Sequence, residues 1–144
     1  MKIVITGANS FIGQNFISHL KRLNASNDLE LILVTRKTEA ICDTRITNIT
    51  CELGEYSKLG DKVGSCDCLF HLAWTGTRGN SRNNHAEQQY AKEYSILGIR
   101  SLLDRGCKKV ITAGSQAEYG FIPEIVTERS DCKPNTEYGI QKLE

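Results

Sequence analysis

The stretch Thr6-Gly7-Ala8-Asn9-Ser10-Phe11-Ile12-Gly13 lies between an apolar run, Lys2 to Thr6, and a segment with helical periodicity. We expect Gly7 to adopt a positive φ in a tight turn, and Gly13 to let the helix pack closely on the strand. The N-terminus of such a helix presents amide groups and the positive end of a dipole, which suit a pyrophosphate. A strand, a glycine turn and a helix in this order predict a dinucleotide site. A tight turn without a ligand is the alternative.

The rest of the chain alternates short apolar runs with longer mixed segments. Besides 2–6, strands are predicted over 29–35, 46–51, 67–72 and 108–112. Continuous apolar runs of this length are typical of parallel strands that are covered on both faces. Strand and helix in repetition predict an α/β fold, a Rossmann-like doubly wound parallel sheet with helices on both faces.

Two helices are predicted between these strands. Ser10 is the expected N-cap of the first helix. Its apolar face comprises Phe11, Phe16, Ile17, Leu20 and Leu23. The second helix is expected between Asn84 and Arg105, with Gly106 as its C-cap. Its apolar stripe comprises Tyr90, Tyr94, Leu97, Leu102 and Leu103. Loops are expected over 75–84 and 119–135.

Composition narrows the function classes. With 144 residues, 40% hydrophobic and 24% charged, the chain has the size of one globular domain. A net charge of +1 gives no reason to expect nucleic-acid or membrane binding, and no apolar run is long enough to span a bilayer. Because the sequence carries no secretory signal, we expect a cytoplasmic protein with reduced thiols. No metal site is predicted from the six cysteines, which are Cys42, Cys51, Cys66, Cys68, Cys107 and Cys132.

The tip of the second predicted strand bears on the choice of cofactor. It reads Val34-Thr35-Arg36-Lys37 and carries no carboxylate. In dinucleotide sites an acidic residue here binds the ribose 2′-OH, whereas an arginine suits a 2′-phosphate. Arg36 therefore favours NADP over NAD. A solvated basic loop is the alternative.

Three side chains near the C-terminus form a candidate catalytic set. Ser115 follows the last predicted strand, at the edge where open α/β sheets bind ligands. Tyr138 and Lys142 are four residues apart and share a face of a helix that is expected to start at Pro134 or Asn135. A nearby ammonium group stabilises a phenolate, which makes Tyr138 a candidate general acid/base. An exposed tyrosine beside a solvated lysine is the alternative for this pair.

The glycine turn, Ser115 and Tyr138-x-x-x-Lys142, in this order, resemble the extended short-chain dehydrogenase/reductase family, in its sugar-nucleotide epimerase/dehydratase branch. One departure is Ser10, which replaces the middle glycine of that family's Thr-Gly-x-x-Gly-x-x-Gly. Its side chain either narrows the approach of the phosphate, caps the helix or binds the phosphate directly. Glu52-Leu53 and His71-Leu72-Ala73 resemble two further steps beside the cofactor, and His71 is expected to be structural. The resemblance assigns cofactor contacts to Gly7, Asn9, Ser10, Phe11, Ile12, Gly13, Arg36, Glu52, Leu53, Leu72, Ala73, Tyr138 and Lys142.

The resemblance implies an NAD(P)-dependent oxidoreductase or epimerase that acts on a nucleotide-linked sugar. Ser115 would orient the sugar oxygen, Tyr138 would exchange a proton with it, and Lys142 would hold the nicotinamide ribose. The 4,6-dehydratases carry Asp and Glu where this chain has Gln116 and Ala117, so an epimerase or 4-keto-reductase is favoured. Glu118 is one position later and is expected to point elsewhere on an extended segment.

Members of this family continue far beyond the Tyr-Lys helix, whereas Glu144 comes two residues after Lys142. We therefore expect residues 1–144 to be an NAD(P)-binding Rossmann domain, with the substrate-binding domain absent from this chain. The resemblance also suggests a homodimer. A non-catalytic dinucleotide-binding module, or a fragment of a longer enzyme, is the alternative.

Overall fold

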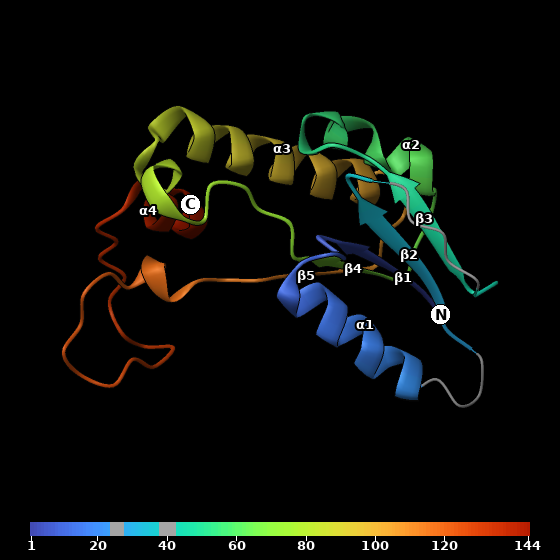
Figure 1. Cartoon of the computed structure of the whole chain (residues 1–144), viewed down its shortest axis with the longest axis horizontal. Coiled ribbons are helices and arrows are strands. Elements are labelled where there is room, and N and C mark those ends of the chain that lie inside the picture. The colour runs from blue at the N-terminus through green and yellow to red at the C-terminus, as the bar shows by residue number, and fades with distance from the viewer. Residues whose placement is uncertain (24–27, 38–42) are drawn as a thin grey trace. The chain divides into compact units, whose positions relative to one another are not determined.

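The computed structural model describes residues 1–23, 28–37 and 43–144 (Figure 1). Cys42 lies outside these ranges. The chain divides into two compact units. The sheet unit comprises Met1–Ala73 and Tyr94–Ala113, and the loop-and-helix unit comprises Trp74–Glu93 and Gly114–Glu144.

The sheet unit is built on five parallel strands in the order β3-β2-β1-β4-β5. Each observed strand begins and ends within one residue of its predicted bounds. The reason is that polar residues flank the apolar run of each strand. The strands are β1 (Lys2–Thr6), β2 (Glu30–Thr35), β3 (Ile46–Thr50), β4 (Cys68–His71) and β5 (Lys109–Thr112). β1 is central, so that Ile5 pairs with Leu33 on one side and with Phe70 on the other.

Within the described ranges, four α-helices and three short 3-10 helices join and follow the strands. The α-helices are α1 (Phe11–Leu23), α2 (Leu59–Val63), α3 (His85–Leu103) and α4 (Glu137–Leu143). The 3-10 helices are η1 (Leu53–Lys58), η2 (Gly79–Asn83) and η3 (Gln116–Glu118). Among the residues that the structure describes, no helix is both long and apolar enough to cross a bilayer.

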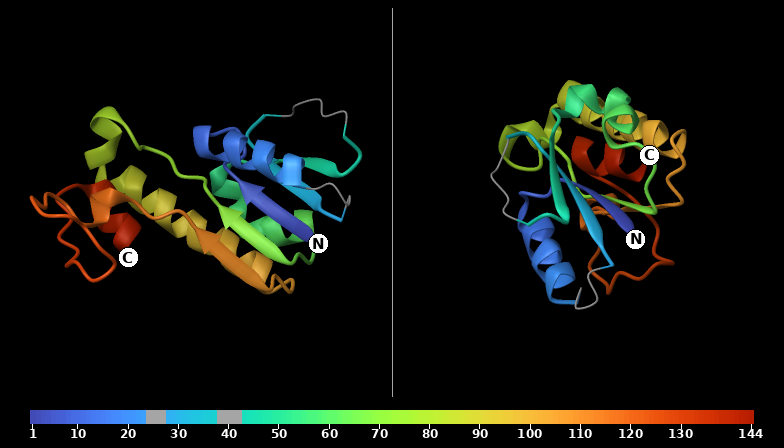
Figure 2. Two further views of the ribbon diagram at one scale, coloured as in Figure 1. Left: turned by 90° about the horizontal axis from the view of Figure 1, so that it is seen from below. Right: turned by 90° about the vertical axis from the view of Figure 1, so that its right-hand side faces the viewer.

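Apolar packing covers both faces of the sheet. Ile3 and Ile5 pack in one cluster with Ile17 of α1. Val4, between them, points the opposite way, into a second cluster with Leu59 of α2 and Leu102 of α3. This alternation follows from the two-residue repeat of a strand. Figures 1 and 2 show α1 on one face and α2 on the other, which confirms the predicted doubly wound α/β fold.

The predicted apolar face of α1 is correct only in its middle. Ile17 is buried, and the Phe16 ring lies 4.5 Å from the Phe70 ring between centroids. Phe11 and Leu23, however, are 83% and 65% exposed. They stand at the first and last positions of the helix, and only the middle turns contact the sheet.

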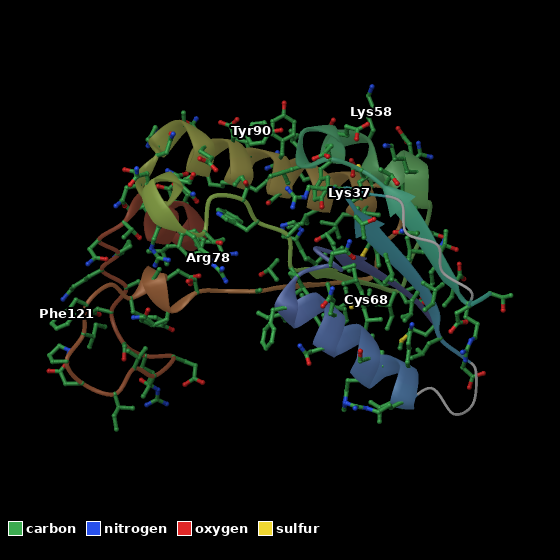
Figure 3. The ribbon with its side chains drawn as sticks, in the orientation of Figure 1. Lys37, Lys58, Cys68, Arg78, Tyr90 and Phe121 are labelled. Carbon is green, nitrogen blue, oxygen red and sulfur yellow. The ribbon has the colours of Figure 1, made fainter. Side chains whose placement is uncertain are left out.

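The predicted apolar stripe of α3 is largely wrong. Tyr90, Leu97 and Leu103 are exposed, and Tyr90 projects away from the helix in Figure 3. The buried face is made of small and polar side chains instead, together with Leu102. It comprises Gln88, Ala91, Ser95, Gly98 and Leu102. Small residues allow a close approach, which a pattern of large apolar residues does not reveal. The predicted end of the helix is confirmed, since Gly106 has φ +89° and the Cys107 N–H donates to the Leu102 carbonyl (3.0 Å).

The sequence reading missed the helical segment over 53–63 and the short η2 inside the predicted loop 75–84. Neither has a long apolar stripe. The loop 119–135 contains no helix or strand, as predicted. The thiols of Cys51, Cys66, Cys68 and Cys107 are free and buried, and that of Cys132 is free and exposed. Burial, followed by the neighbouring Cys107, raises the pKa of the Cys66 thiol to about 12, so this thiol is neutral and unreactive at physiological pH.

Candidate functional site

The glycine turn of the sheet unit has the predicted geometry. Gly7 has φ +69°, and a Cβ at this position would lie only 2.7 Å from the Ala73 nitrogen. The Leu72 N–H donates to the Thr6 carbonyl (3.2 Å) and the Ala73 N–H to Thr6 Oγ1 (3.4 Å). The turn after β1 and the segment after β4 therefore meet at the carboxyl edge of the sheet, where open α/β sheets bind ligands.

Ser10 acts as the N-cap of α1. Its Oγ accepts a hydrogen bond from the Gly13 N–H (3.0 Å), and its carbonyl accepts one from the Gln14 N–H (2.9 Å). Of the three roles that the sequence left open for Ser10, the structure shows capping. Gly13 is needed in addition because a Cβ there would overlap the carbonyl oxygens of Gly7 and Ala8.

The first turn of α1 fits a pyrophosphate. Phe11 and Ile12 open the helix, so their N–H groups have no acceptor within it. Both side chains are exposed. Amide donors at the positive end of a 13-residue helix, beside a glycine that lets a ligand approach the backbone, match the needs of a dinucleotide phosphate.

Arg36 and Glu52 follow two adjacent strands. The Cys51 N–H donates to the Thr35 carbonyl (2.9 Å), which extends the pairing of β2 and β3 up to these two residues. Both side chains are exposed. Leu53 begins η1 and packs against the apolar cluster on the α2 side of the sheet. The structure thus places Arg36 and Glu52 at the same edge of the sheet as the glycine turn.

His71 is buried, as a structural role requires. Its Nδ1 lies 2.8 Å from Thr6 Oγ1, and its ring meets the Tyr56 ring edge-on at 6.2 Å between centroids. Burial raises the pKa of the Tyr56 phenol, so it remains protonated. These three side chains form a polar base beneath the carboxyl ends of β1 and β4.

In the loop-and-helix unit, Ser115 directly precedes η3 and caps it. Its Oγ accepts a hydrogen bond from the Ala117 N–H (3.2 Å). The Glu118 carboxylate turns back and accepts a hydrogen bond from the Ser115 N–H (2.5 Å). The expectation that Glu118 points elsewhere on an extended segment is therefore wrong, because the backbone coils into a 3-10 turn after Ser115.

The helix α4 carries Tyr138 and Lys142, and it begins later than predicted. Thr136 is its N-cap, because Thr136 Oγ1 accepts from the Gly139 N–H (3.1 Å), so neither Pro134 nor Asn135 starts the helix. Gly139 has no side chain to hold α4 away from η3, and a Cβ there would overlap the Ala117 carbonyl. The Ser115 turn and the Tyr-Lys helix are therefore in direct backbone contact.

Tyr138 and Lys142 share a helix face, as predicted, and both meet Trp74. The Tyr138 ring lies edge-on to the Trp74 ring at 6.1 Å between centroids, and Lys142 Nζ lies 4.3 Å from the centre of the Trp74 ring. The guanidinium of Arg82 stacks on the other aromatic ring, 4.8 Å from the centre of Tyr138. The sequence did not predict that Trp74 and Arg82 contact these side chains. Both residues lie in a loop, where no periodic pattern indicates their position.

A fully buried glutamine organises the loop that carries Trp74 and Arg82. Gln88 Oε1 accepts from Trp74 Nε1 (2.8 Å), and Gln88 Nε2 donates to the carbonyls of Gly76 (2.7 Å) and Ser81 (2.9 Å). All three bonds hold the loop against the first turn of α3.

Burial lowers the pKa of the Lys142 ammonium, while the charge of Glu118 acts in the opposite direction. A lysine of this kind exchanges a proton more readily than a solvated one. It sits one helical turn from Tyr138, so the loop-and-helix unit combines a phenol, an ammonium and a capped serine hydroxyl.

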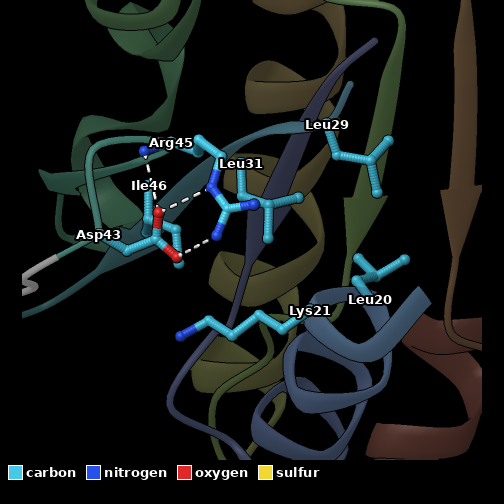
Figure 4. A pocket seen from close by; sticks show the side chains of 7 residues that line it. All are labelled: Leu20, Lys21, Leu29, Leu31, Asp43, Arg45 and Ile46. Atoms are coloured by element: carbon cyan, nitrogen blue, oxygen red, sulfur yellow. Dashed lines mark hydrogen bonds and ion pairs between the residues drawn. The ribbon is translucent and has the colours of Figure 1, made fainter. Parts of the chain in front are cut away.

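The shallow pocket in Figure 4 is unrelated to these residues. It is lined by Leu20, Lys21, Leu29, Leu31, Asp43, Arg45 and Ile46. Leu31 and Ile46 stand near the amino ends of their strands, the edge opposite the glycine turn. Within 1–23, 28–37 and 43–144, no three His, Cys, Asp or Glu side chains gather in a way that could hold a metal ion.

Residues 3–144 match the family described as "NAD dependent epimerase/dehydratase family". The chain belongs to this family. The dTDP-6-deoxy-L-talose 4-dehydrogenase (NAD(+)) of Aggregatibacter actinomycetemcomitans is 28% identical over 147 residues, which cover 99% of this chain and 52% of the relative. The D-erythronate dehydrogenase of Haemophilus influenzae is 30% identical over 154 residues, which cover 99% of this chain and 47% of the relative.

Solved structures confirm that this epimerase/dehydratase family member has the Rossmann fold. MoeE5 in complex with UDP-glucose and NAD superposes with a TM-score of 0.83 at 22% identity, covering 99% of this chain and 46% of MoeE5. A UDP-galactose 4-epimerase superposes with a TM-score of 0.80 at 23% identity, covering 99% of this chain and 48% of the epimerase. The chain thus spans about half the length of the proteins that it matches.

Proposed function

We propose that the chain forms the cofactor-binding and catalytic-residue part of an NAD(P)-dependent enzyme that acts on a nucleotide-linked sugar. The observation that carries this proposal is α4, where Tyr138 and Lys142 share one face and meet Trp74, with the Ser115 turn packed on the same helix. A protein that only binds a dinucleotide has no chemical need for this set.

In the proposed site, Gly7, Ser10 and Gly13 shape the turn, and the first amides of α1 bind the pyrophosphate. The bound nicotinamide would accept or supply the hydride. Tyr138 Oη exchanges a proton with the sugar oxygen, and Lys142 holds the ribose and stabilises the phenolate. The Ser115 hydroxyl donates a hydrogen bond to the same sugar oxygen.

Within this reaction class we favour an epimerase or a 4-keto-reductase over a 4,6-dehydratase. Elimination of water from a sugar needs an acid and a base. Gln116 carries an amide, whose nitrogen lies 3.3 Å from the Gly120 carbonyl, and Ala117 is a buried methyl group. The one carboxylate in this turn, Glu118, is bound to the Ser115 N–H.

Replacing Tyr138 by Phe tests the catalytic assignment. Turnover of a nucleotide sugar should fall by about 10²–10⁴-fold, since the phenolic proton is lost, whereas NADPH binding measured by calorimetry should persist. Tyr90→Phe is the matched control, because Tyr90 is an exposed tyrosine of the same unit, and it should leave turnover unchanged. Full activity in Tyr138→Phe would contradict the assignment.

The second candidate is a dinucleotide-binding module without activity of its own. It is favoured by the glycine turn, which lies wholly in the sheet unit and needs none of the side chains of α4. Binding of NADPH without turnover of UDP- or dTDP-sugars by the chain, and by any longer form that contains it, would support this candidate.

We propose NADP as the preferred cofactor because Arg36 directly follows β2 and its side chain is exposed. A guanidinium–phosphate pair contributes about 1.5–3 kcal/mol. Arg36→Ala should therefore weaken NADPH binding by about 10–100-fold and leave NADH binding unchanged. Lys37→Ala is the control, and it should weaken NADPH binding less than Arg36→Ala does. Equal affinity for NADPH and NADH in the unaltered chain would contradict this preference.

A further inference from the structure

The turn after β5 is held by two reciprocal side-chain bonds. Ser115 Oγ accepts from the Ala117 N–H (3.2 Å), and Glu118 Oε1 accepts from the Ser115 N–H (2.5 Å). This is a capping box, in which the Ser115 side chain accepts from a main-chain N–H within the turn and the Glu118 side chain accepts from the Ser115 N–H. The bond to Ser115 is charge-assisted, which makes it the stronger of the two.

The same two bonds decide what the Ser115 hydroxyl can still do. A serine hydroxyl has one hydrogen to donate and two lone pairs to accept. The Ala117 N–H takes up a lone pair, so the hydroxyl keeps its hydrogen available for another acceptor. The hydrogen bond from the Ser115 N–H to Glu118 holds the backbone that carries this hydroxyl. Ser115 has an extended backbone conformation (φ −142°, ψ 141°), so the helical hydrogen bonds of η3 do not fix its conformation.

None of the ion pairs in this unit, all of which lies within the described ranges, involves Glu118, although its charge also acts to raise the pKa of Lys142 against the larger effect of burial. Its carboxylate also lies 3.4 Å from the position that a Cβ of Gly114 would occupy, so it is close to the backbone of both Gly114 and Ser115. A carboxylate on a three-residue turn stabilises little structure of its own. Its hydrogen bond is made to the Ser115 N–H.

We propose that Glu118 is a positioning residue, which acts by holding the main chain of Ser115 so that the serine hydroxyl donates to the sugar oxygen. This inference rests on the proposed function of Ser115. Glu118 does not itself exchange a proton with the substrate, because its carboxylate serves as the acceptor for the Ser115 N–H. The length of the side chain at position 118 therefore decides whether the Ser115 N–H is reached, whereas the charge of Glu118 strengthens that bond and acts separately on the pKa of Lys142.

Two variants separate reach from charge. Glu118→Gln keeps the length of the side chain and an acceptor oxygen but removes the charge. Glu118→Asp keeps the charge but is one methylene too short for the Ser115 N–H. We expect Glu118→Gln to stay within about threefold of the unaltered kcat, and Glu118→Asp to lose about 10–100-fold in kcat with little change in KM, since a misplaced group costs rate rather than binding.

A second measurement does not need turnover. In ¹H–¹⁵N spectra of the full chain, the Ser115 amide should lie downfield and exchange slowly with solvent, and both properties should persist in Glu118→Gln and disappear in Glu118→Asp. An unchanged Ser115 amide in Glu118→Asp overturns the inference, whatever the activity. The reverse order of the variants in kcat, with Asp active and Gln inactive, also overturns it, because Glu118 would then act through its charge.

The failure of the proposed function looks different. If Ser115→Ala retains full turnover, Ser115 has no catalytic role, and Glu118 has no hydroxyl to position. If Ser115→Ala loses activity while Glu118→Asp keeps it, the proposed function stands and the role of Glu118 is overturned.

Discussion

The two units of this chain are stabilised by different means. In the sheet unit, large apolar side chains such as Ile5, Leu59, Leu69 and Leu102 are fully buried. In the loop-and-helix unit, all of which the structure describes, the buried apolar residues are Ala91 and Ala117. Its other buried side chains are the amides of Gln88 and Gln141.

This difference separates a scaffold from a set of reactive groups. Burial of apolar area is non-directional and gives the sheet unit its stability. Hydrogen bonds, caps and ring contacts are directional but individually weak, and they hold Trp74, Ser115, Tyr138 and Lys142 in defined orientations. We therefore expect the loop-and-helix unit to open before the sheet unit, and its polar contacts to affect function more than global stability.

The largest expected effect is in the sheet unit. Leu69→Ala removes a fully buried side chain from the second apolar cluster and should cost about 2–5 kcal/mol, as read by urea unfolding followed by far-UV circular dichroism. Leu97→Ala, at a side chain that is 39% exposed, should cost less than about 1 kcal/mol. If both variants lost the same free energy of unfolding, burial of apolar side chains would not be what stabilises the sheet unit.

The next effect is confined to the loop-and-helix unit. Gly139→Ala should cost about 1–3 kcal/mol, because the new Cβ would lie 2.9 Å from the Ala117 carbonyl carbon. Trp74 is the single tryptophan, so its fluorescence reports this unit. The fluorescence transition in urea should move to lower concentration while the far-UV transition stays in place.

Gly114→Ala is the matched control for that variant, since its Cβ would make only ordinary contact, 3.4 Å from Glu118 Oε1. It should leave the Trp74 transition where it is. Coincident shifts of both transitions in Gly139→Ala would show that the two units unfold as one.

Two equivalent caps sharpen the comparison. Ser10→Ala and Thr136→Ala each remove one N-cap hydrogen bond, and each should cost about 1 kcal/mol of local stability. The loss at Ser10 falls on a 13-residue helix that packs on the sheet, and the loss at Thr136 on a seven-residue helix. Hydrogen exchange should therefore increase along all of α4 in Thr136→Ala, but only in the first turn of α1 in Ser10→Ala.

The smallest effect concerns pH. Burial lowers the pKa of Lys142 below 10.5, so between the lowered pKa and 10.5 the unfolded chain binds more protons than the folded one. Stability therefore rises with pH across this window, and at neutral pH the buried charge is unfavourable. Lys142→Met should slightly raise the melting temperature at pH 7, and this difference should shrink as the pH approaches 10.5.

Lys133→Met, whose side chain is 76% exposed, is the control and should show no such trend. A lower melting temperature for Lys142→Met at pH 7 would mean that the contact of Lys142 with the Trp74 ring outweighs the cost of burying the charge.

The features predicted correctly are those set by local chemistry. The strands follow from apolar runs, the positive φ of Gly7 from its place between strand and helix, and the shared face of Tyr138 and Lys142 from a spacing of four. The errors arose where long-range packing decides. Phe11 looked like a core residue and is exposed, whereas Gln88 was overlooked and is fully buried because three polar partners surround it.

The sequence by itself determined the doubly wound sheet and the residue types available at its carboxyl edge, because backbone preference and apolar periodicity are local properties. Only the tertiary structure decided that Trp74 meets Tyr138 and Lys142, that Gly139 brings α4 onto the Ser115 turn, and that Glu118 binds Ser115. Such contacts depend on which backbone segments can approach one another, and so does the direction of a side chain within a short helical turn. No local pattern along the chain encodes that approach directly.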